Sequence, residues 1–233
     1  MNRSPVLRMF GFSHRNNRAV RGVREEALPQ QPYMNLVPDS PGCGSALLFD
    51  LDGTLVDTWE ANYCSYRDSL AESGIACSRQ RFAPCFGGHW RDFLPLLAGS
   101  SDEQLLLRIH HRKQALYPDH LATVRVNAPL IALLRAARPA WTTGLVTTAS
   151  RSNAALLLAH LGIADAFDCI VTGDDVALAK PAPDGYQRCL EHLHASAAGS
   201  LAFEDSPTGI AAAQAAGLRV HVVSGFTVGM TQG

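Results

Sequence analysis

From Asn127 onward, the sequence alternates between segments with helical spacing and short apolar runs typical of strands. The helical segments read APLIALLRAA, SNAALLLAHLGI, PDGYQRCLEHL and SPTGIAAAQAAG, and the strand-like runs read WTTGLVTT, FDCIVTG, SLAFED and RVHVVSG. Helices between successive strands at these lengths are the pattern of a parallel sheet with crossover helices. We therefore predict an open α/β sheet, a fold that binds ligands outside the carboxyl ends of its strands.

One more strand is predicted earlier in the chain, in the stretch LLFDLDGTLVDT at residues 47–58. Residues 47–49 are apolar on both faces, which suits a strand covered on both sides, and Gly53 breaks it. Asp50 and Asp52 then stand at the strand tip, where alternation points them the same way. Two carboxylates that close repel each other, and a bound cation is the simplest offset. Read alone, this pattern also suits a turn or part of a calcium loop.

The first strand and the alternating region are separated by a stretch of different character. Residues 59–124 carry apolar groups at helical spacing, interrupted by glycines, and show no clear strand. Their histidines have no consistent metal-ligand spacing. The sequence therefore predicts a helical insert within the α/β domain.

Composition excludes several classes of protein. The 233 residues are 47% hydrophobic and 18% charged with a net charge of −1, so no overall field favours nucleic acid or a membrane surface. No apolar run is long enough to span a bilayer. The six cysteines are scattered without a Cys-x-x-Cys pair, which predicts free thiols in a reducing compartment such as the cytoplasm.

The first 44 residues differ from the rest of the chain. Residues 1–24 carry six arginines and no acidic residue, and prolines follow. This composition is open to three interpretations: an organelle transit peptide, a disordered extension, or a gene start placed too early, with Met34 as the true start. We predict that residues 1–44 are a disordered N-terminal extension outside the fold.

The predicted strand ends gather polar residues at one edge of the sheet. These residues are Asp50 and Asp52, Thr147 and Thr148, Lys180 in the loop after FDCIVTG, and the acidic pair Glu204 and Asp205. Each has a plain alternative as a helix cap or a surface residue, but together they suit phosphoryl transfer. A carboxylate attacks phosphorus, a lysine and a metal held by carboxylates neutralise charge, hydroxyls hold the phosphate, and a second carboxylate moves protons.

These residues resemble the motifs of the haloacid dehalogenase superfamily, specifically its phosphatase branch. DLDGTLVDT resembles the first motif, Thr147 the second, Lys180 in KPAPDGY the third, and FEDSPTGIAAAQAAG the fourth, and the resemblance covers about residues 45–225. The last two motifs are most similar to the β-phosphoglucomutase and phosphoglycolate phosphatase group. The resemblance implies a Rossmann-like parallel sheet core with helices on both faces (45–58 and 125–233) and an inserted α-helical cap (59–124).

The resemblance also implies a role for each residue. Asp50 is expected to be the nucleophile and Asp52 the general acid/base. Thr147, with Thr148 beside it, is expected to bind the phosphoryl group. Because TTAS is a less usual second motif, the assignment of this role between Thr147 and Thr148 stays open. Lys180 would neutralise charge between nucleophile and phosphate.

A Mg²⁺ ion is the implied cofactor. Its implied ligands are the side chains of Asp50 and Asp205 and the backbone carbonyl of Asp52, with Glu204 in or near the metal shell. In the insert, FGGHWRDF at 86–93 falls where this group contacts substrate, so His89, Trp90 and Arg91 are substrate candidates, with a plain helix start as the alternative.

The leading hypothesis is a Mg²⁺-dependent phosphatase that hydrolyses a small phosphomonoester, of sugar phosphate or phosphoglycolate type, through an aspartyl-phosphate. An acid at position 52 favours an ester because its alkoxide must be protonated. A phosphomutase of the β-phosphoglucomutase type and a non-catalytic relative that binds phosphorylated ligands are the alternatives. The expected partner is a small phosphorylated metabolite, with no nucleic acid and no membrane, and the expected state is a monomer or weak homodimer.

Overall fold

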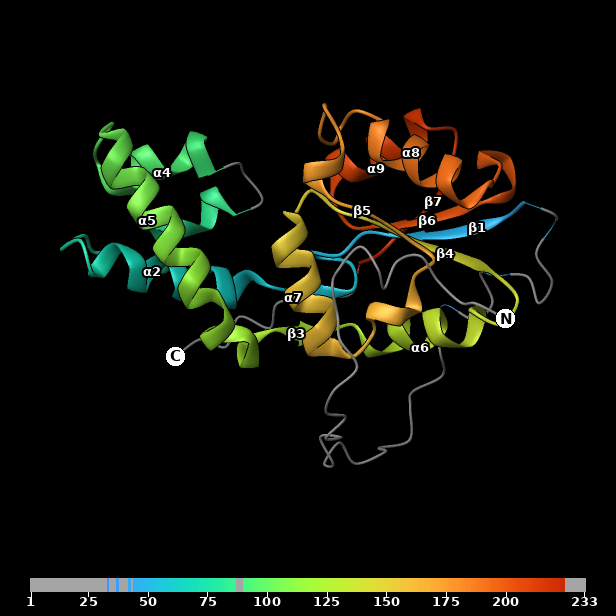
Figure 1. Ribbon diagram of the computed structural model, residues 1–233, viewed down its shortest axis with the longest axis horizontal. Helices are drawn as coiled ribbons and strands as arrows, with labels where there is room; N and C mark the ends of the chain where they lie inside the picture. Colours follow the sequence, from blue (N-terminus) through green and yellow to red (C-terminus); the bar gives the residue numbers. More distant parts are fainter. Residues whose placement is uncertain (1–32, 34–36, 38–41, 43, 87–89, 225–233) are drawn as a thin grey trace. The chain divides into compact units, whose positions relative to one another are not determined.

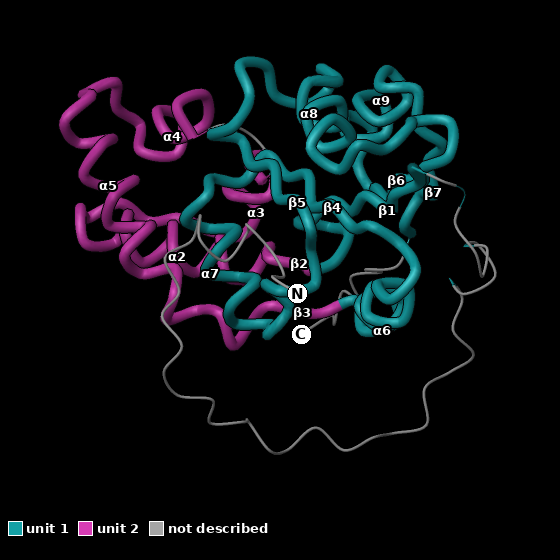
Figure 2. The backbone as a smooth tube through the Cα atoms, turned by 45° about the vertical axis from the view of Figure 1, so that its right-hand side comes forward, with its two compact units in different colours: residues 1–55, 127–233 teal, residues 56–126 magenta. Residues whose placement is uncertain are grey.

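The computed structural model describes residues 33, 37, 42, 44–86 and 90–224. The chain divides into two compact units, residues 1–55 with 127–233 (unit 1) and residues 56–126 (unit 2), coloured separately in Figure 2. Most of the predicted extension 1–44 lies outside the described residues.

Unit 1 is built on a five-stranded sheet in the order β5-β4-β1-β6-β7, in which every pairing is parallel. The strands are β1 (Ala46–Phe49), β4 (Thr142–Val146), β5 (Cys169–Val171), β6 (Leu201–Glu204) and β7 (Arg219–Val222). The predicted α/β fold with a parallel sheet is therefore confirmed.

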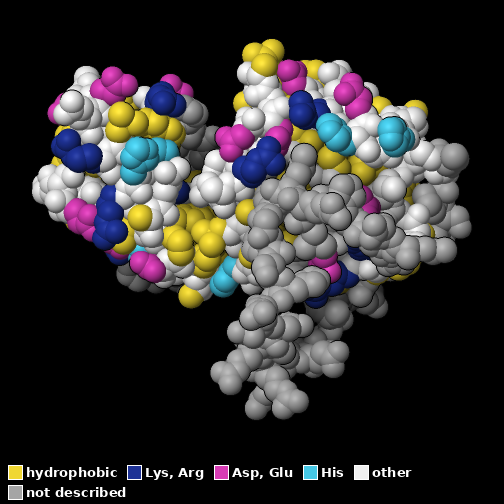
Figure 3. All heavy atoms as spheres, viewed as in Figure 1, with side chains coloured by type: hydrophobic (Ala, Val, Ile, Leu, Met, Phe, Trp, Pro, Cys, Tyr) yellow, Lys and Arg dark blue, Asp and Glu magenta, His cyan; other side chains and the backbone are white. Residues whose placement is uncertain are grey.

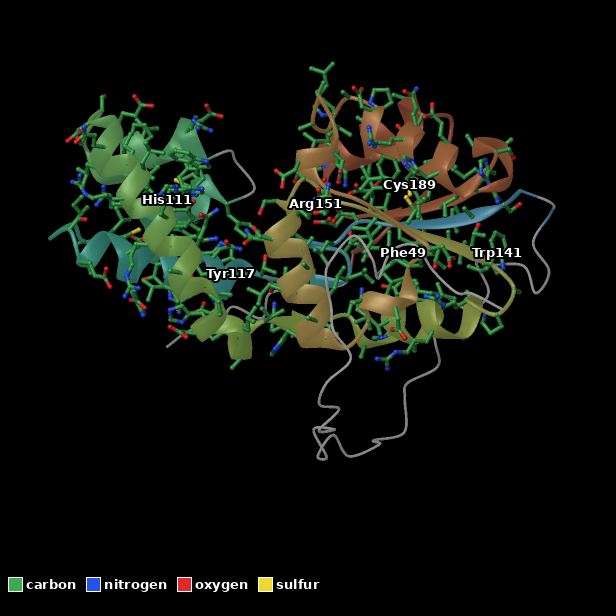
Figure 4. The ribbon with its side chains drawn as sticks, in the orientation of Figure 1. Phe49, His111, Tyr117, Trp141, Arg151 and Cys189 are labelled. Atoms are coloured by element: carbon green, nitrogen blue, oxygen red, sulfur yellow. The ribbon has the colours of Figure 1, made fainter. Side chains whose placement is uncertain are left out.

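Helices cover both faces of this sheet. Helices α8 and α9 lie on one face and α6 and α7 on the other (Figure 1). Their bounds are α6 (Ala128–Ala137), α7 (Arg151–Leu161), α8 (Asp184–Leu193) and α9 (Pro207–Ala215). Leu48 and Ala202 pack in one core cluster with residues of α8 and α9, including Cys189. Because alternate strand residues point to opposite faces, Phe49 lies on the other side of the sheet from Cys189 (Figure 4).

Three of the four helices that cover the sheet of unit 1 begin at side-chain caps that the sequence supplies, whereas α8 follows Pro183 and has no such cap. Asn127, Ser150 and Ser206 each precede a helix and accept a hydrogen bond from a backbone N–H of its first turn. Gly162 ends α7 in the left-handed region at φ 63°, as its position in the sequence predicts.

The first strand is shorter than the sequence indicated. β1 ends at Phe49, whereas the apolar pattern extended the strand to Asp52. The N–H of Asp50 still donates to the carbonyl of Phe203 at 3.1 Å, and the chain then enters the turn at 53–55. Asp52 therefore lies outside the regular strand, and strand alternation does not decide its direction.

Unit 2 is mainly helical. Its helices are α2 (Trp59–Ala71), α3 (Arg79–Phe82), α4 (Trp90–Ala98) and α5 (Glu103–Leu116), with 3₁₀ segments at Ala83–Cys85 and Tyr117–Thr123. An antiparallel pair, β2 (Val56–Asp57) and β3 (Arg125–Val126), was not predicted from the sequence. Asp57 and Arg125 also form an ion pair at 2.6 Å across this pair, so the two ends of the unit are held together.

The surface carries no single dominant charge on the face shown in Figure 3. Basic and acidic side chains of the described residues are interspersed there, as the net charge of −1 indicates. Within the described ranges, no helix is long and apolar enough to cross a membrane.

Candidate active site

The carboxyl ends of three neighbouring strands bring the predicted acidic and basic residues together. β1 is flanked by β4 and β6, and parallel pairing sets their ends at one edge of the sheet. Asp50 follows β1, Thr147 follows β4, and Glu204 is the last residue of β6. The structure thus brings residues from three separate segments of the sequence to one edge of the sheet.

Lys180 connects the residues of this site by hydrogen bonds to three of them. Its Nζ donates to Asp50 Oδ1 at 2.6 Å, to Glu204 Oε1 at 2.6 Å and to the carbonyl of Val146 at 2.9 Å. An ammonium group has three N–H donors, so these contacts use all of them. The Lys180 side chain is only 8% exposed. Burial lowers the pKa of Lys180, but the two carboxylates raise it by more, and the lysine remains a cation.

Glu204 is the most deeply buried acid of the site. It is fully buried and also accepts from the Tyr186 hydroxyl at 2.7 Å, the Asp205 N–H at 3.2 Å and the Ser206 hydroxyl at 3.4 Å. A Cβ atom at Gly209 would lie 2.1 Å from this carboxylate, so the glycine leaves the space that the acid fills.

Tyr186 was missed by the sequence analysis, although it stands within KPAPDGY. It is fully buried in the first turn of α8, and burial raises the pKa of its phenol well above the ordinary value. The phenol therefore stays protonated as a hydrogen-bond donor. A tyrosine on the apolar face of a helix needs a polar partner, and that requirement was the available signal.

Asp205 is held against the turn that carries Asp52. The hydroxyl of Thr54 donates to Asp205 Oδ1 at 3.0 Å. Gly53 has a φ of +93°, and a Cβ there would lie 2.1 Å from Asp205 Oδ2. Position 53 therefore requires glycine for two reasons, its backbone conformation and the close approach of the Asp205 carboxylate. Asp52 itself is partly buried in this segment.

Three carboxylates of the site are close enough to share a cation. Oxygen atoms of Asp50, Glu204 and Asp205 all lie within 4.8 Å of one another. Carboxylate oxygens are the ligands that Mg²⁺ prefers, and three acids with one lysine leave an excess of negative charge. The residues present therefore fit a magnesium ion. The fourth predicted ligand residue, Asp52, contributes no side-chain oxygen to this group among the described residues.

Burial raises the pKa values of two acids of the site. Burial raises the pKa of Asp50 to about 8; Lys180 opposes the shift and the charge of Glu204 adds to it. Burial also raises the pKa of Asp205, against the hydrogen bond from Thr54. A divalent cation among these oxygens would favour the ionised carboxylates.

The two threonines after β4 have different environments. Thr147 is 4% exposed, and its Oγ1 accepts from the N–H of Ala149 at 3.1 Å, whereas Thr148 is exposed. The loop is joined to the one after β5, because the Gly173 N–H donates to Ala149 O at 2.9 Å. A Cβ at Gly173 would lie 2.5 Å from Thr148 O, so the two loops are in close contact.

The substrate candidates of the insert belong to unit 2. Trp90 is the first residue of α4 and stacks on His110 with ring centroids 4.1 Å apart. The guanidinium of Arg91 lies 4.5 Å from the centroid of the Trp90 ring. His89 lies outside the described residues.

The family described as haloacid dehalogenase-like hydrolase matches residues 47–223 of the chain. Protein CbbY of Rhodobacter capsulatus is 36% identical over 189 residues, covering 75% of this chain and 83% of that protein. Fructose-1-phosphate phosphatase YqaB of Escherichia coli is 30% identical over 178 residues, covering 75% and 93%. The crystal structure of CbbY from Rhodobacter sphaeroides in complex with phosphate superposes with a TM-score of 0.67 at 28% identity, covering 78% and 86%.

These matches span the sheet, the insert and all four strand-end segments. The superfamily resemblance drawn from DLDGTLVDT, Thr147, KPAPDGY and FEDSPTGIAAAQAAG is thus confirmed. The chain belongs to the haloacid dehalogenase-like hydrolases and, on their phosphatase branch, is a phosphoric monoester hydrolase.

Proposed function

We propose that the protein is a magnesium-dependent phosphatase that hydrolyses a small phosphomonoester through a phosphorylated Asp50. The observation that carries this proposal is the cluster in which Lys180 holds Asp50 and Glu204 at 2.6 Å each, with Asp205 alongside. Such a cluster combines a nucleophile, a fixed cation and oxygen ligands for a metal at the ligand-binding edge of the sheet.

Asp50 is the proposed nucleophile. Its carboxylate attacks phosphorus, so that a new O–P bond forms while the ester O–P bond breaks. The carboxyl must be ionised to attack, and its burial opposes ionisation. Lys180 favours the ionised form and fixes the direction of Oδ1. The lysine therefore both activates the nucleophile and offsets the approach of an anionic phosphate.

Asp52 is the proposed general acid/base. It gives a proton to the alkoxide that leaves phosphorus, and then accepts a proton from the water that hydrolyses the aspartyl-phosphate. Its partly buried position, just beyond β1 and before Gly53, supports a group that meets both the reaction centre and water.

Thr148 is the better candidate for holding the phosphate oxygens. Its side chain is exposed, whereas the hydroxyl oxygen of Thr147 accepts a hydrogen bond within its own loop. The second-motif role thus moves one residue along the chain from the first assignment. Thr147 then shapes the loop that presents Thr148.

Asp50, Glu204 and Asp205, with the backbone carbonyl of Asp52, are the proposed ligands of Mg²⁺. When bound, the ion would neutralise charge that develops on the transferring phosphoryl group. Glu204 already accepts from Lys180 and Tyr186, so its share of the metal is the outer one.

Residues 59–124 are the proposed helical cap that selects the substrate, with residues 45–58 and 125–233 as the core. One relative is named a fructose-1-phosphate phosphatase, and CbbY of Rhodobacter sphaeroides has been crystallised with xylulose-(1,5)bisphosphate. We therefore infer a sugar phosphate or a phosphoglycolate-type ester as substrate. Arg91, stacked on Trp90, is the proposed cap contact to its anionic group.

The proposed compartment is the cytoplasm, and the proposed state is a monomer or weak homodimer. The support for the compartment is that five of the cysteines are free thiols, namely Cys64, Cys77, Cys85, Cys169 and Cys189. Buried thiols of this kind suit a reducing environment.

The test is phosphate release from p-nitrophenyl phosphate and a panel of small phosphate esters, with magnesium and with a chelator. Asp50→Asn should abolish release, while Asp165→Asn, the same change at an exposed aspartate of unit 1, should leave it intact. Full turnover by the Asp50→Asn variant would refute the mechanism. Isomerisation of a sugar phosphate that depends on a sugar bisphosphate would instead identify a mutase.

A further inference from the structure

A row of aromatic rings includes the strand residues that precede the proposed catalytic carboxylates in the chain. Phe49, Phe203 and His221 are register partners on β1, β6 and β7, so they share one face of the sheet. Phe49 and Phe203 stack with centroids 4.8 Å apart and planes 6° apart, and Phe203 meets His221 at 5.7 Å. Asp50 follows Phe49 in the chain, and Glu204 follows Phe203. The row therefore fixes the two backbone positions from which these acids project.

The end of this row is covered by a residue from far outside the α/β sequence pattern. Tyr33 is 9% exposed, and its ring meets Phe203 edge-on at 6.4 Å and 89°, and His221 at 5.6 Å and 84°. Edge-to-face contacts at these distances are attractive beyond the area that they bury. Twelve residues separate Tyr33 from the first residue of β1, so this contact belongs to the segment that the sequence analysis set aside.

We propose that Tyr33 is a positioning residue, which docks on Phe203 and His221 and steadies the strand ends that carry Asp50 and Glu204. The link to Asp50 is a backbone hydrogen bond, because the Asp50 N–H donates to the carbonyl of Phe203 at 3.1 Å. Tyr33 is therefore linked to the proposed nucleophile by its contact with Phe203 and by the hydrogen bond from Asp50 to the same residue. The significance for catalysis rests on the proposed function, whereas the docking itself does not.

The environment of His221 supplies an independent probe of the docking. Burial lowers its pKa, and the rings of Tyr33 and Phe203 lie against its imidazole. Removing the Tyr33 ring would return water to the imidazole. A chain that began at Met34, the alternative start named in the sequence analysis, would lack Tyr33 and this contact.

The experiment compares full-length wild type with Tyr33→Ala and Tyr33→Phe by NMR. In Tyr33→Ala, the pKa of His221 should rise toward its ordinary value. Exchange of the Asp50 amide should quicken by about 3- to 10-fold, which corresponds to the loss of one aromatic contact. The Thr147 amide, which donates to Val171 O on the other side of β1, is the internal reference and should not change. Tyr33→Phe keeps the ring and should restore both values.

Turnover of the best ester provides the third reading. Tyr33→Ala should lower kcat with little change in KM, and Tyr33→Phe should recover it. An unchanged His221 titration in Tyr33→Ala would overturn the docking. A shifted titration with an unchanged Asp50 amide would overturn the positioning role. If wild type hydrolyses no ester, the proposed function fails, and the two NMR readings still decide this inference.

Discussion

Replacing Tyr186 with phenylalanine removes a single buried hydrogen bond from the site. The hydroxyl is fully buried and donates to Glu204 Oε1 at 2.7 Å, on an acid that is ion-paired with Lys180. A hydrogen bond to a charged group contributes about 1.5–3 kcal/mol to stability. For a chain of this size, each kcal/mol moves the unfolding temperature by about 2–4 °C, so Tyr186→Phe should lower it by about 3–12 °C. The ring itself keeps its packing.

A matched substitution isolates the charge of the acceptor. Tyr63→Phe in unit 2 removes a hydroxyl that donates to the neutral carbonyl of Cys77 at 3.4 Å, and should cost at most about 0.5–1 kcal/mol. Both variants are unfolded in a scanning calorimeter with a chelator present, so that no metal stabilises Glu204. Calorimetry resolves separate transitions if the two units unfold independently. Equal losses in the two variants would refute the inference that Tyr186 stabilises a buried carboxylate.

Three further changes test other parts of the site. Gly53→Ala should abolish turnover and destabilise the fold by more than the roughly 1–2 kcal/mol that the left-handed backbone costs, because the new Cβ would clash with Asp205. The control is Gly74→Ala, at φ +75° with open space around it, which should show the cost of the backbone conformation alone. Urea unfolding measures both. Lys180→Met should cost about 3–5 kcal/mol and eliminate phosphate release, because it leaves buried carboxylates unpaired; a stable, active variant would contradict this. Burial holds the pKa of His221 below 6.5, so as the pH falls the imidazole of the unfolded chain binds a proton before that of the folded chain. The urea midpoint of wild type should therefore fall as the pH drops below about 6.5, and it should fall less in His221→Phe.

Much of the site was predictable because a parallel sheet turns sequence order into spatial proximity. Asp50, Lys180, Glu204 and Asp205 are separated by up to 155 positions, yet each stands where a strand or its following loop ends. Knowing that the strands are parallel is enough to bring those ends to one edge. The exact strand limits were less predictable, since β1 and β4 each stop before the polar residue that the apolar run suggested.

The contacts that the sequence did not reveal depend on side chains that meet across the fold. Tyr186 lies 18 residues from Glu204, and Tyr33 lies far from Phe203, with no periodic pattern that links either pair. Tyr33 also stands in a segment whose overall composition predicted disorder, and composition cannot show that one ring of such a segment is buried. The pairing of Asp57 with Arg125 was hidden for a related reason, because two-residue strands are too short to show alternation.

Four residues of the fourth motif, Glu204, Asp205, Ser206 and Gly209, have a physical reason in the structure. Ala202 packs on the α8 and α9 side of the sheet, so alternation sends the Glu204 carboxylate to the same side, toward Tyr186. The strand then stops, and Asp205 turns instead to the hydroxyl of Thr54.

Ser206 caps α9 by accepting from the Gly209 N–H at 3.0 Å, which points the start of the helix at the Glu204 carboxylate. The absent side chain at Gly209 then leaves room for that carboxylate. The positive end of the helix dipole stabilises an acid placed there, as do Lys180 and Tyr186. The two adjacent acids thus have different partners: Glu204 accepts from Lys180 within the core, whereas Asp205 accepts from Thr54 in the turn that follows β1.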